Sequence, residues 1–151
     1  MDVVSRQIRS KMMASIRGKN TKPELLLRKA LHGSGFRFRL HDPKMPGRPD
    51  IVLRRWNAVI FVHGCFWHRH IGCRYSTNPA TRSEFWQEKF AANIAQDFRN
   101  QAQLHQCGIR IGTVWECALR KPDVAEQTFH DVREWLEMSA GDFETGLPSP
   151  A

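Results

Sequence analysis

The sequence predicts an α/β fold, in which one mixed central sheet is flanked by helices. Its 151 residues suit a single domain with one core. The run Ala58–Val62 is apolar without alternation, which is typical of a strand buried on both faces. A long amphipathic segment separates it from a second short apolar run, and this order predicts a β–helix–β crossover, which is right-handed almost without exception.

The N-terminal part predicts two helices. Roughly from Ser5 to Ile16, apolar residues recur at near-helical spacing among basic ones. Two interpretations of this basic helix are open: it packs on the core, or it lies on DNA as an arm with a methionine wedged between bases. The pattern Thr21-Lys22-Pro23-Glu24 is a capping box with Thr21 as the N-cap. From local sequence alone, capping is the favoured role of Glu24. The helix that it begins should end at Gly33.

An antiparallel meander is expected next. Residues 36–40 alternate apolar and basic side chains, which predicts a strand with one buried face. Asp50 begins a second strand after a turn rich in proline and glycine, and residues 54–57 turn the chain into the central strand. Asp50 directly follows a proline at the mouth of its strand. This is a rigid position from which a carboxylate can bind a hard cation such as Mg²⁺.

The C-terminal half predicts a helix, a strand and a second helix. The capping-box pattern Thr81-Arg82-Ser83-Glu84 begins a long helix, whose stripe of Phe90, Ile94 and Phe98 is expected in the core. Residues 109–115 form a strand parallel to the central one, and a last helix runs from about 123 to 137. From Ser139 the chain has little to pack and is expected to be mobile.

Composition and charge indicate where the protein is located in the cell and which kind of partner it could bind. No run approaches the length of a membrane span, and the N-terminus lacks the apolar region of a signal peptide, so we expect a cytoplasmic protein without membrane contact. Residues 1–56 contain 14 Lys or Arg and 4 Asp or Glu, whereas residues 57–151 contain 9 and 11. This basic first third could be a solvated face, or it could bind a phosphate-bearing partner that gains from counterion release.

Three cysteines and one histidine have the composition of a closed structural zinc site: Cys65, His70, Cys73 and Cys117. In the cytoplasm thiols stay reduced, so the alternative interpretation to zinc ligation is that the cysteines are buried free thiols, and not that they form disulfides. Cys65 and Cys117 both follow expected strands, which lets them converge. The fourth cysteine, Cys107, is expected to be a core thiol.

Four ordered blocks and part of the N-terminal arm closely resemble the very short patch repair (Vsr) endonucleases, over roughly residues 5–120. The blocks are Pro46-Gly47-Arg48-Pro49-Asp50, Phe61-Val62-His63-Gly64-Cys65-Phe66-Trp67-His68, Pro79-Ala80-Thr81-Arg82 with Glu84-Phe85-Trp86, and Val114-Trp115-Glu116-Cys117-Ala118-Leu119. Arg9-Ser10-Lys11, with Met13 just after, matches the arm of that family.

The resemblance implies a restriction-endonuclease-like fold of the PD-(D/E)xK superfamily with an added structural zinc. It implies Mg²⁺-dependent nicking of double-stranded DNA 5′ to the thymine of a T·G mismatch, which arises when 5-methylcytosine deaminates. One nuclease domain over residues 1–138 is expected, with residues 1–18 as a DNA-contacting arm and residues 139–151 as a mobile tail. A monomer is expected, with other repair proteins as further candidate partners.

The resemblance also assigns the catalytic residues. Asp50 would bind the catalytic Mg²⁺, helped by the main-chain oxygen of Val62. His68 would be the general base, with His63 and Glu24 supporting it. Physical chemistry agrees, since a metal on a carboxylate polarises the phosphodiester and a nearby histidine can take the proton of water. From the residues alone, His68 could instead ligate zinc, and His63 could be a hydrogen-bonded strand-end residue.

The remaining implied roles are DNA contact and zinc ligation. Phe66, Trp67 and Trp86 would insert beside the mismatch from the major groove, and Met13 would approach from the minor groove with Arg9 and Lys11 on the same arm. Zinc would bind Cys65, His70, Cys73 and Cys117. The alternative for the aromatic residues is core packing. A mismatch is cheaper to unstack than a paired step, so aromatic wedges discriminate by deformability as well as by contact.

The sequence departs from the usual nuclease pattern at the central strand, where Phe61-Val62-His63 replaces a second acid and a lysine. Val62 also replaces a hydroxyl residue of the family, which is harmless if only its carbonyl coordinates. Two other functions remain in view: a zinc-stabilised module that binds distorted DNA without cutting it, and a nuclease of the same fold with a different target.

Overall fold

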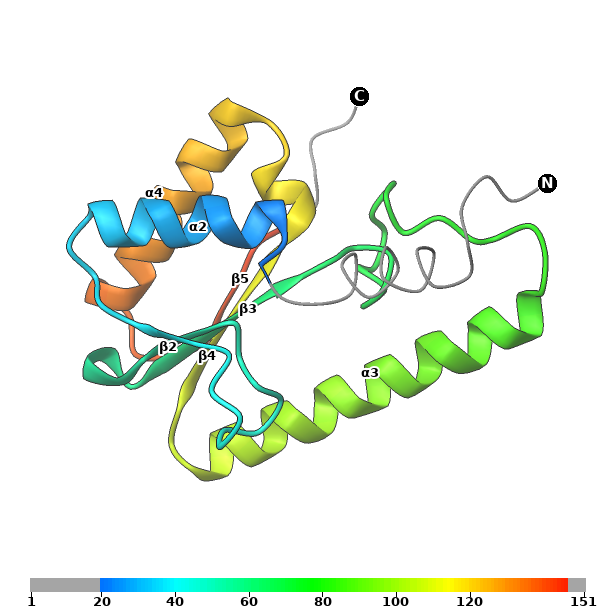
Figure 1. Ribbon diagram of the computed structural model, residues 1–151, viewed down its shortest axis with the longest axis horizontal. Coiled ribbons are helices and arrows are strands. Elements are labelled where there is room, and N and C mark those ends of the chain that lie inside the picture. Colours follow the sequence, from blue (N-terminus) through cyan, green and yellow to red (C-terminus); the bar gives the residue numbers. More distant parts are fainter. Residues whose placement is uncertain (1–19, 147–151) are drawn as a thin grey trace.

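The computed structural model describes residues 20–146, which form a five-stranded mixed sheet with helices on both faces (Figure 1). The sheet order follows the chain, β1-β2-β3-β4-β5. The strands are β1 (Arg39–Leu40), β2 (Ile51–Leu53), β3 (Ala58–His63), β4 (Arg110–Trp115) and β5 (Phe143–Glu144). The α-helices are α2 (Lys22–Gly33), α3 (Ser83–Gln106) and α4 (Pro122–Met138), and two short 3₁₀ helices lie at Arg54–Trp56 and Glu116–Leu119.

The strand pairing confirms both topological expectations. β1, β2 and β3 pair antiparallel, as the meander predicted, and β3 pairs parallel with β4 across the α3 crossover. The register places His63 opposite Trp115, so the carboxyl ends of the two central strands lie side by side. The segments that leave these ends therefore begin at the same edge of the sheet.

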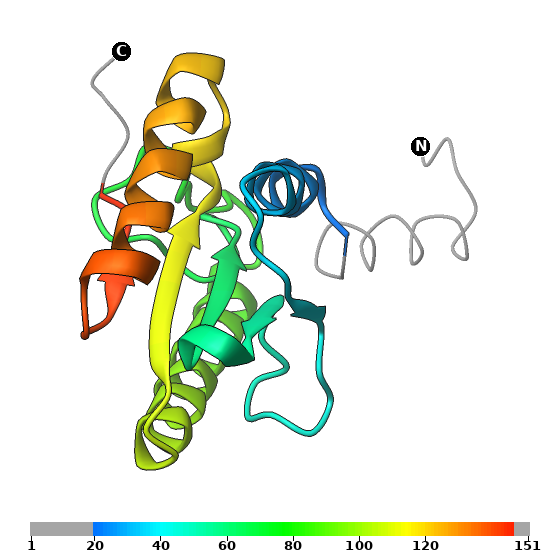
Figure 2. The same cartoon turned by 90° about the vertical axis from the view of Figure 1, so that its left-hand side faces the viewer.

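Helices α2 and α4 cover one face of the sheet, and α3 crosses the other (Figures 1 and 2). Apolar side chains of α2, α4, β2 and β3 form the larger core cluster, in which Leu27, Ile60 and Val132 are fully buried. A smaller cluster joins Leu104 of α3 to the opposite face of the sheet. The apolar run of β3 is buried on both faces because helices lie on both sides of it.

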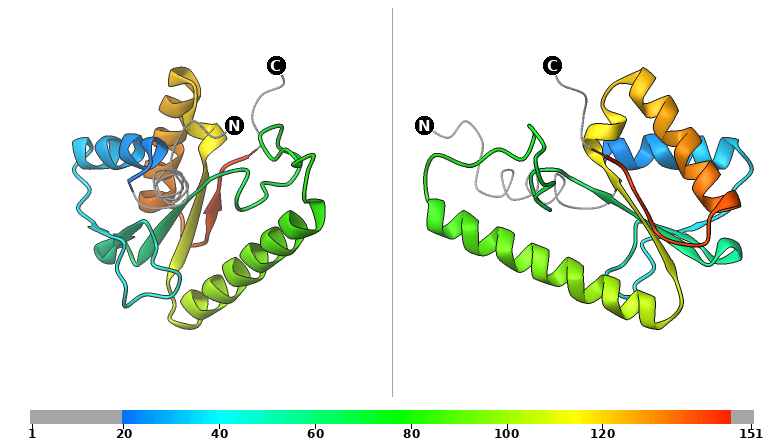
Figure 3. Two further views of the ribbon diagram at one scale, coloured as in Figure 1. Left: turned by 45° about the vertical axis from the view of Figure 1, so that its right-hand side comes forward. Right: turned by 180° about the vertical axis from the view of Figure 1, so that it is seen from behind.

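The first half of α3 extends beyond the sheet, next to the segment that follows β3 (Figures 1 and 3). Its 24 residues span about 36 Å, whereas a six-residue strand spans about 20 Å. The expectation that Phe90, Ile94 and Phe98 all lie in the core is wrong. Phe90 is buried, packed against Phe66 and Trp86, but Ile94 is 39% exposed and Phe98 is 70% exposed.

Both expected capping boxes differ from the structure. Thr21 is the N-cap of α2, but its side chain makes no capping hydrogen bond. The N-cap of α3 is Arg82, in a left-handed backbone conformation, so Thr81 is not the cap. The expected strand over residues 36–40 is reduced to Arg39–Leu40, since Phe36 turns into the core beside Trp56.

The segment after Ser139 also differs from expectation. Residues 143–144 form β5, which extends the sheet parallel to β4. Asp142 accepts a hydrogen bond from the Ile111 amide, and Thr145 accepts one from the Trp115 amide. The expectation of a mobile tail is therefore wrong for residues 142–145. Cys107 is exposed and is not the expected core thiol.

The expected basic helix, with Arg9, Lys11 and Met13, lies outside the described residues. Between residues 20 and 146 no helix has the length and apolar character that crossing a bilayer requires.

Candidate functional site

Asp50 lies near the carboxyl end of the central strand although it directly precedes the neighbouring strand β2. β2 runs antiparallel to β3 with Ile51 opposite Ile60, so the residue before Ile51 lies near the end of β3. Asp50 Oδ2 accepts a hydrogen bond from the Val62 amide at 2.7 Å, which fixes the carboxylate against the strand. Burial, together with the nearby Glu24 carboxylate, raises the pKa of Asp50 from 3.8 to about 7.

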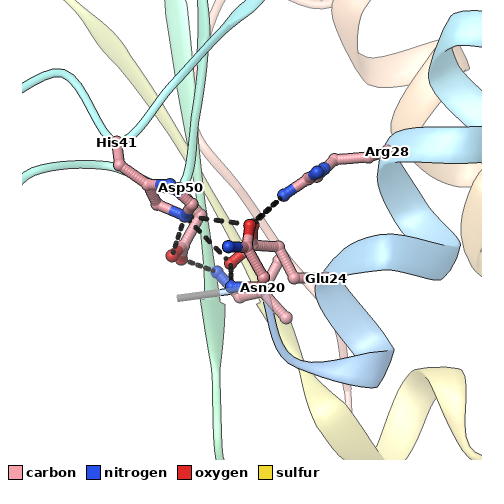
Figure 4. A network of polar contacts seen from close by, with 6 residues as sticks. Asn20, Glu24, Arg28, His41 and Asp50 are labelled. Atoms are coloured by element: carbon pink, nitrogen blue, oxygen red, sulfur yellow. Dashed lines mark hydrogen bonds and ion pairs between the residues drawn. The ribbon is translucent and has the colours of Figure 1, made fainter. Parts of the chain in front are cut away.

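Glu24 and His41 complete a buried polar network around Asp50 (Figure 4). The Glu24 side chain is 1% exposed and forms an ion pair with Arg28 at 2.7 Å. His41 Nε2 lies 3.0 Å from Glu24 Oε2 and 3.7 Å from Asp50 Oδ1. Glu24 also accepts the backbone N–H of Asn20 at 3.3 Å. Glu24, expected to support His68, thus has its described contacts on the Asp50 side of the site.

His68 lies in the turn that follows β3, with its backbone N–H donating to the Gly64 carbonyl. Its Nδ1 is 2.7 Å from Oδ2 of Asp97 on α3. Its ring stacks on the ring of His63 at 3.9 Å between centroids and 4° between planes. His63 is buried, and burial together with His68 lowers the pKa of His63 below its ordinary value. Strand end and helix therefore hold His68 from two sides.

Asp50 and His68 line the same cleft, which has a volume of about 570 Å³. His63 does not line it and lies behind His68. Among the described residues that line the cleft, Arg120 is the only arginine or lysine. The cleft is lined by Thr21, Pro23, Glu24, Asp50, Val62, Gly64, Phe66, Trp67, His68, Asn93, Glu116 and Arg120. It therefore combines three carboxylates, an imidazole, a guanidinium and two aromatic rings in one hollow.

The predicted zinc ligands come together in a separate buried cluster. One ligand atom each from Cys65, His70, Cys73 and Cys117 lies within 4.8 Å of the others. His70 Nδ1 is 3.7 Å from Cys65 Sγ and 3.5 Å from Cys117 Sγ. Zinc–sulfur bonds of about 2.3 Å and zinc–nitrogen bonds of about 2.0–2.1 Å give tetrahedral N···S edges of roughly 3.5–3.6 Å.

These four side chains fit a tetrahedral soft cation. A hydrogen bond with Cys117 and burial raise the pKa of the Cys65 thiol. Thiols packed this way resist ionisation unless a cation replaces their protons. The cluster could therefore hold a metal ion that joins the turn after β3 to the end of β4. All four positions are taken by protein, so such an ion would have a structural and not a catalytic role.

The aromatic side chains expected at the DNA form a half-buried cluster between the turn and α3. Phe66 packs edge-on against Trp67, Trp86 and Phe90 at centroid distances of 5.0–5.6 Å. Arg69 lies over the Phe90 ring at 4.1 Å and donates to the carbonyls of residues 76 and 77. The three expected wedges are neither buried in the core nor fully exposed. They form a preassembled apolar surface at the cleft.

The structure adds three site residues that sequence reasoning missed: His41, Asp97 and Arg120. Each is a single polar residue outside any motif with a chemical signature. His41 is placed by the pairing of β1 with β2, and Asp97 by the path of α3 beneath the turn. Of these three residues, only His41 has a local sequence feature that could have identified it, namely its position in the short segment before the proline-rich turn.

Comparison with known proteins gives a consistent result. The family model described as DNA mismatch endonuclease Vsr matches residues 1–74. The DNA mismatch endonuclease Vsr of Escherichia coli K12 is 42% identical over 137 residues, which cover 89% of this chain and 87% of that protein. The type II nicking enzyme V.XorIIP of Xanthomonas oryzae pv. oryzae is 47% identical over 118 residues, covering 78% and 86%. V.NmeAIP of Neisseria meningitidis serogroup A, also a type II nicking enzyme, is 39% identical over 126 residues, covering 83% and 89%.

Proposed function

This chain belongs to the Vsr family of DNA mismatch endonucleases, and we propose that it nicks double-stranded DNA on the 5′ side of the thymine in a T·G mismatch. Such a nick begins repair of deaminated 5-methylcytosine. The observation that carries the proposal is that Asp50 and His68 line one cleft. A carboxylate and an imidazole can then act on the same phosphodiester.

Asp50 and the main-chain oxygen of Val62 are proposed to hold a catalytic Mg²⁺. Oxygen donors suit this hard cation, and the carboxylate is already fixed by the Val62 amide. When bound, the ion supplies polarisation of the phosphate and neutralisation of its developing charge. Glu24 orients the neighbouring His41 and adds negative charge behind Asp50.

His68 is proposed to be the general base. Because its Nδ1 contacts the Asp97 carboxylate, that nitrogen carries the hydrogen and Nε2 can accept the proton of an attacking water. The water oxygen then attacks phosphorus, the bond from phosphorus to the leaving oxygen breaks, and the leaving oxygen takes up a proton from solvent. The His63 ring, stacked behind His68, prevents the imidazole from rotating out of position. His63 and Asp97 are therefore positioning residues.

Recognition of the mismatch is proposed for Phe66, Trp67 and Trp86. Phe66 and Trp67 line the cleft and Trp86 packs against Trp67, and a T·G step costs less to unstack than a paired one. Met13, Arg9 and Lys11 are proposed to contact the DNA from the other groove. The ion in the Cys65-His70-Cys73-Cys117 cluster is proposed to be Zn²⁺, which would fix the turn that carries Phe66 and Trp67.

The fold is proposed to be restriction-endonuclease-like, in a monomer with one nuclease domain that includes β5 and whose residues 1–18 contact DNA. A mixed sheet with the acid directly before an antiparallel strand beside the central one supports this assignment.

The test uses two end-labelled duplexes that differ only in one pair, T·G or T·A, incubated with the protein and Mg²⁺. We expect one nick, mapped to the 5′ side of the mismatched thymine, and no nick in the T·A duplex or with Asp50→Ala. Equal cleavage of both duplexes would indicate a nuclease with another target. Tight binding to the T·G duplex without cleavage in any divalent metal would indicate a binding module.

A further inference from the structure

The His41 imidazole places a nitrogen atom, a possible metal ligand, beside the carboxylates of Glu24 and Asp50. Its Nε2 lies 3.0 Å from Glu24 Oε2, 3.1 Å from Glu24 Oε1 and 3.7 Å from Asp50 Oδ1. One ligand atom from each of these three residues lies within 4.8 Å of the other two. Figure 4 shows the His41 ring directed at both carboxylates, and His41 directly follows β1.

The backbone of His41 is held in an uncommon conformation. Its φ of 47° lies in the left-handed region, which non-glycine residues seldom adopt. Its N–H donates to the Asp50 carbonyl at 3.3 Å, and its side chain is only 10% exposed. Backbone strain of this kind tends to occur at functional sites. The fold therefore fixes this imidazole beside Asp50 despite the strain.

The spacing of the three donors suits an octahedral cation. Bonds of about 2.1 Å place neighbouring ligand atoms about 3.0 Å apart. The distance from His41 Nε2 to Glu24 Oε2 equals such an edge, and the distance from His41 Nε2 to Asp50 Oδ1 is 3.7 Å. Arg28 pairs with one of the two carboxylates, which leaves the Asp50 carboxyl group and the imidazole to attract a divalent ion.

We propose that His41 is a nitrogen ligand of the divalent cation bound by Asp50, and that it makes this site bind first-row transition-metal ions such as Mn²⁺ more tightly than Mg²⁺. The proposal rests on the proposed role of Asp50 in metal binding. Imidazole nitrogen strengthens binding of transition-metal ions, whereas Mg²⁺ gains little from it and prefers oxygen. In this proposal, the preference for transition-metal ions over Mg²⁺ is due to the His41 side chain.

A second cluster in the described residues, His63-His68-Asp97, also brings donors within 4.8 Å of one another. Its two imidazole rings are parallel and stacked, with 3.9 Å between centroids. Stacked rings do not direct their nitrogen lone pairs at one point, which disfavours two ligands that converge on one ion. Binding of metal there is the competing outcome of the test.

The experiment is pulsed electron paramagnetic resonance on the full-length, zinc-loaded protein with Mn²⁺ added. We expect electron spin echo modulation from a directly bound imidazole ¹⁴N in the wild type. The modulation should be lost in His41→Gln and retained in His68→Gln. It should also be retained in His130→Gln, which removes the histidine of an exposed pair with Glu134 on α4. Titration calorimetry should show Mn²⁺ affinity falling at least about tenfold in His41→Gln, and Mg²⁺ affinity less than about threefold.

Absence of ¹⁴N modulation in the wild type would overturn the proposal without any variant. Loss of the signal in His68→Gln with retention in His41→Gln would place the ion at the second cluster and overturn it too. Circular dichroism and thermal melting establish that His41→Gln is folded. Failure of the proposed function looks different: Asp50→Ala would still nick DNA, or T·G duplexes would not be preferred, whatever the resonance data show.

Discussion

Nδ1 of His68 lies 2.7 Å from Oδ2 of Asp97, a residue 29 positions later on α3. This contact joins the turn after the central strand to the helix beneath it, and it fixes which nitrogen of the imidazole carries hydrogen. In Asp97→Asn the amide can present its N–H₂ to Nδ1, which favours the wrong tautomer. We expect the single-turnover nicking rate to fall about 10²-fold or more, with DNA affinity unchanged within about threefold.

A matched control for Asp97→Asn is Asp131→Asn on α4, where the carboxylate accepts a bond from Gln127 away from the cleft. The control should nick at the wild-type rate. If Asp97→Asn weakens DNA binding as much as it slows nicking, Asp97 contributes to the fold of the interface and not to the orientation of His68.

Asp50→Asn should abolish nicking and yet stabilise the metal-free protein at high pH. The folded-state pKa of Asp50 is raised to about 7 from 3.8, chiefly by burial. Between these pH values the folded protein keeps a proton that the unfolded chain has released, so this group's contribution to stability is lost as pH rises. We expect Asp50→Asn to raise the free energy of unfolding by roughly 1–3 kcal/mol at pH 8 and to change it little below pH 4.

Urea unfolding at pH 8 without added Mg²⁺ measures this difference, with the exposed Glu126→Gln as the control. The same protonation should make Mg²⁺ binding by the wild type weaken by up to about tenfold per pH unit below pH 7. If Asp50→Asn is less stable than the wild type at pH 8, the claim that burial makes the ionised Asp50 carboxylate unfavourable is refuted.

Cys117→Ser should prevent the Cys65-His70-Cys73-Cys117 cluster from holding the proposed zinc ion. The wild type is expected to contain one zinc per chain by elemental analysis, and the variant close to none, because one of four buried ligands is gone. We expect a loss of at least about 2 kcal/mol in stability and a larger loss in T·G nicking, since the turn carries His68, Phe66 and Trp67. Cys107→Ser, which removes an exposed thiol, should change neither.

Trp86→Ala should reduce discrimination between T·G and T·A duplexes. Trp86 supports Phe66 and Trp67 at centroid distances of 5.6 and 5.7 Å. Stacking on one base is worth about 1–3 kcal/mol, so the ratio of nicking rates should fall about tenfold. Phe98→Ala, on the far half of the same helix, should leave the ratio unchanged. An unchanged ratio in Trp86→Ala would remove this residue from mismatch recognition.

The central part of the fold could be predicted because its signals are local. The unbroken apolar run of β3 predicted burial on both faces, and the order of strand, helix and strand predicted the parallel pairing with β4. The metal cluster followed from residue type and from the parallel strand ends that carry Cys65 and Cys117. These features depend on neighbours in sequence or on a single topological rule.

The features that were missed depend on distant contacts. β5 has two residues and is held by Asp142 and Thr145, which no periodicity reveals. The helical stripe of α3 predicts an apolar face, but it does not say how much sheet lies beneath, and so Ile94 and Phe98 are exposed. His41 and Asp97 become site residues only through strand pairing and helix position.

The central claim is that Asp50 and His68 act on the same phosphodiester, and single-turnover nicking of a T·G duplex by Asp50→Asn and His68→Asn tests it most directly. We predict that each variant nicks at least about 10³-fold more slowly than the wild type, with duplex affinity within about threefold. A near-wild-type nicking rate in either variant would contradict the claim.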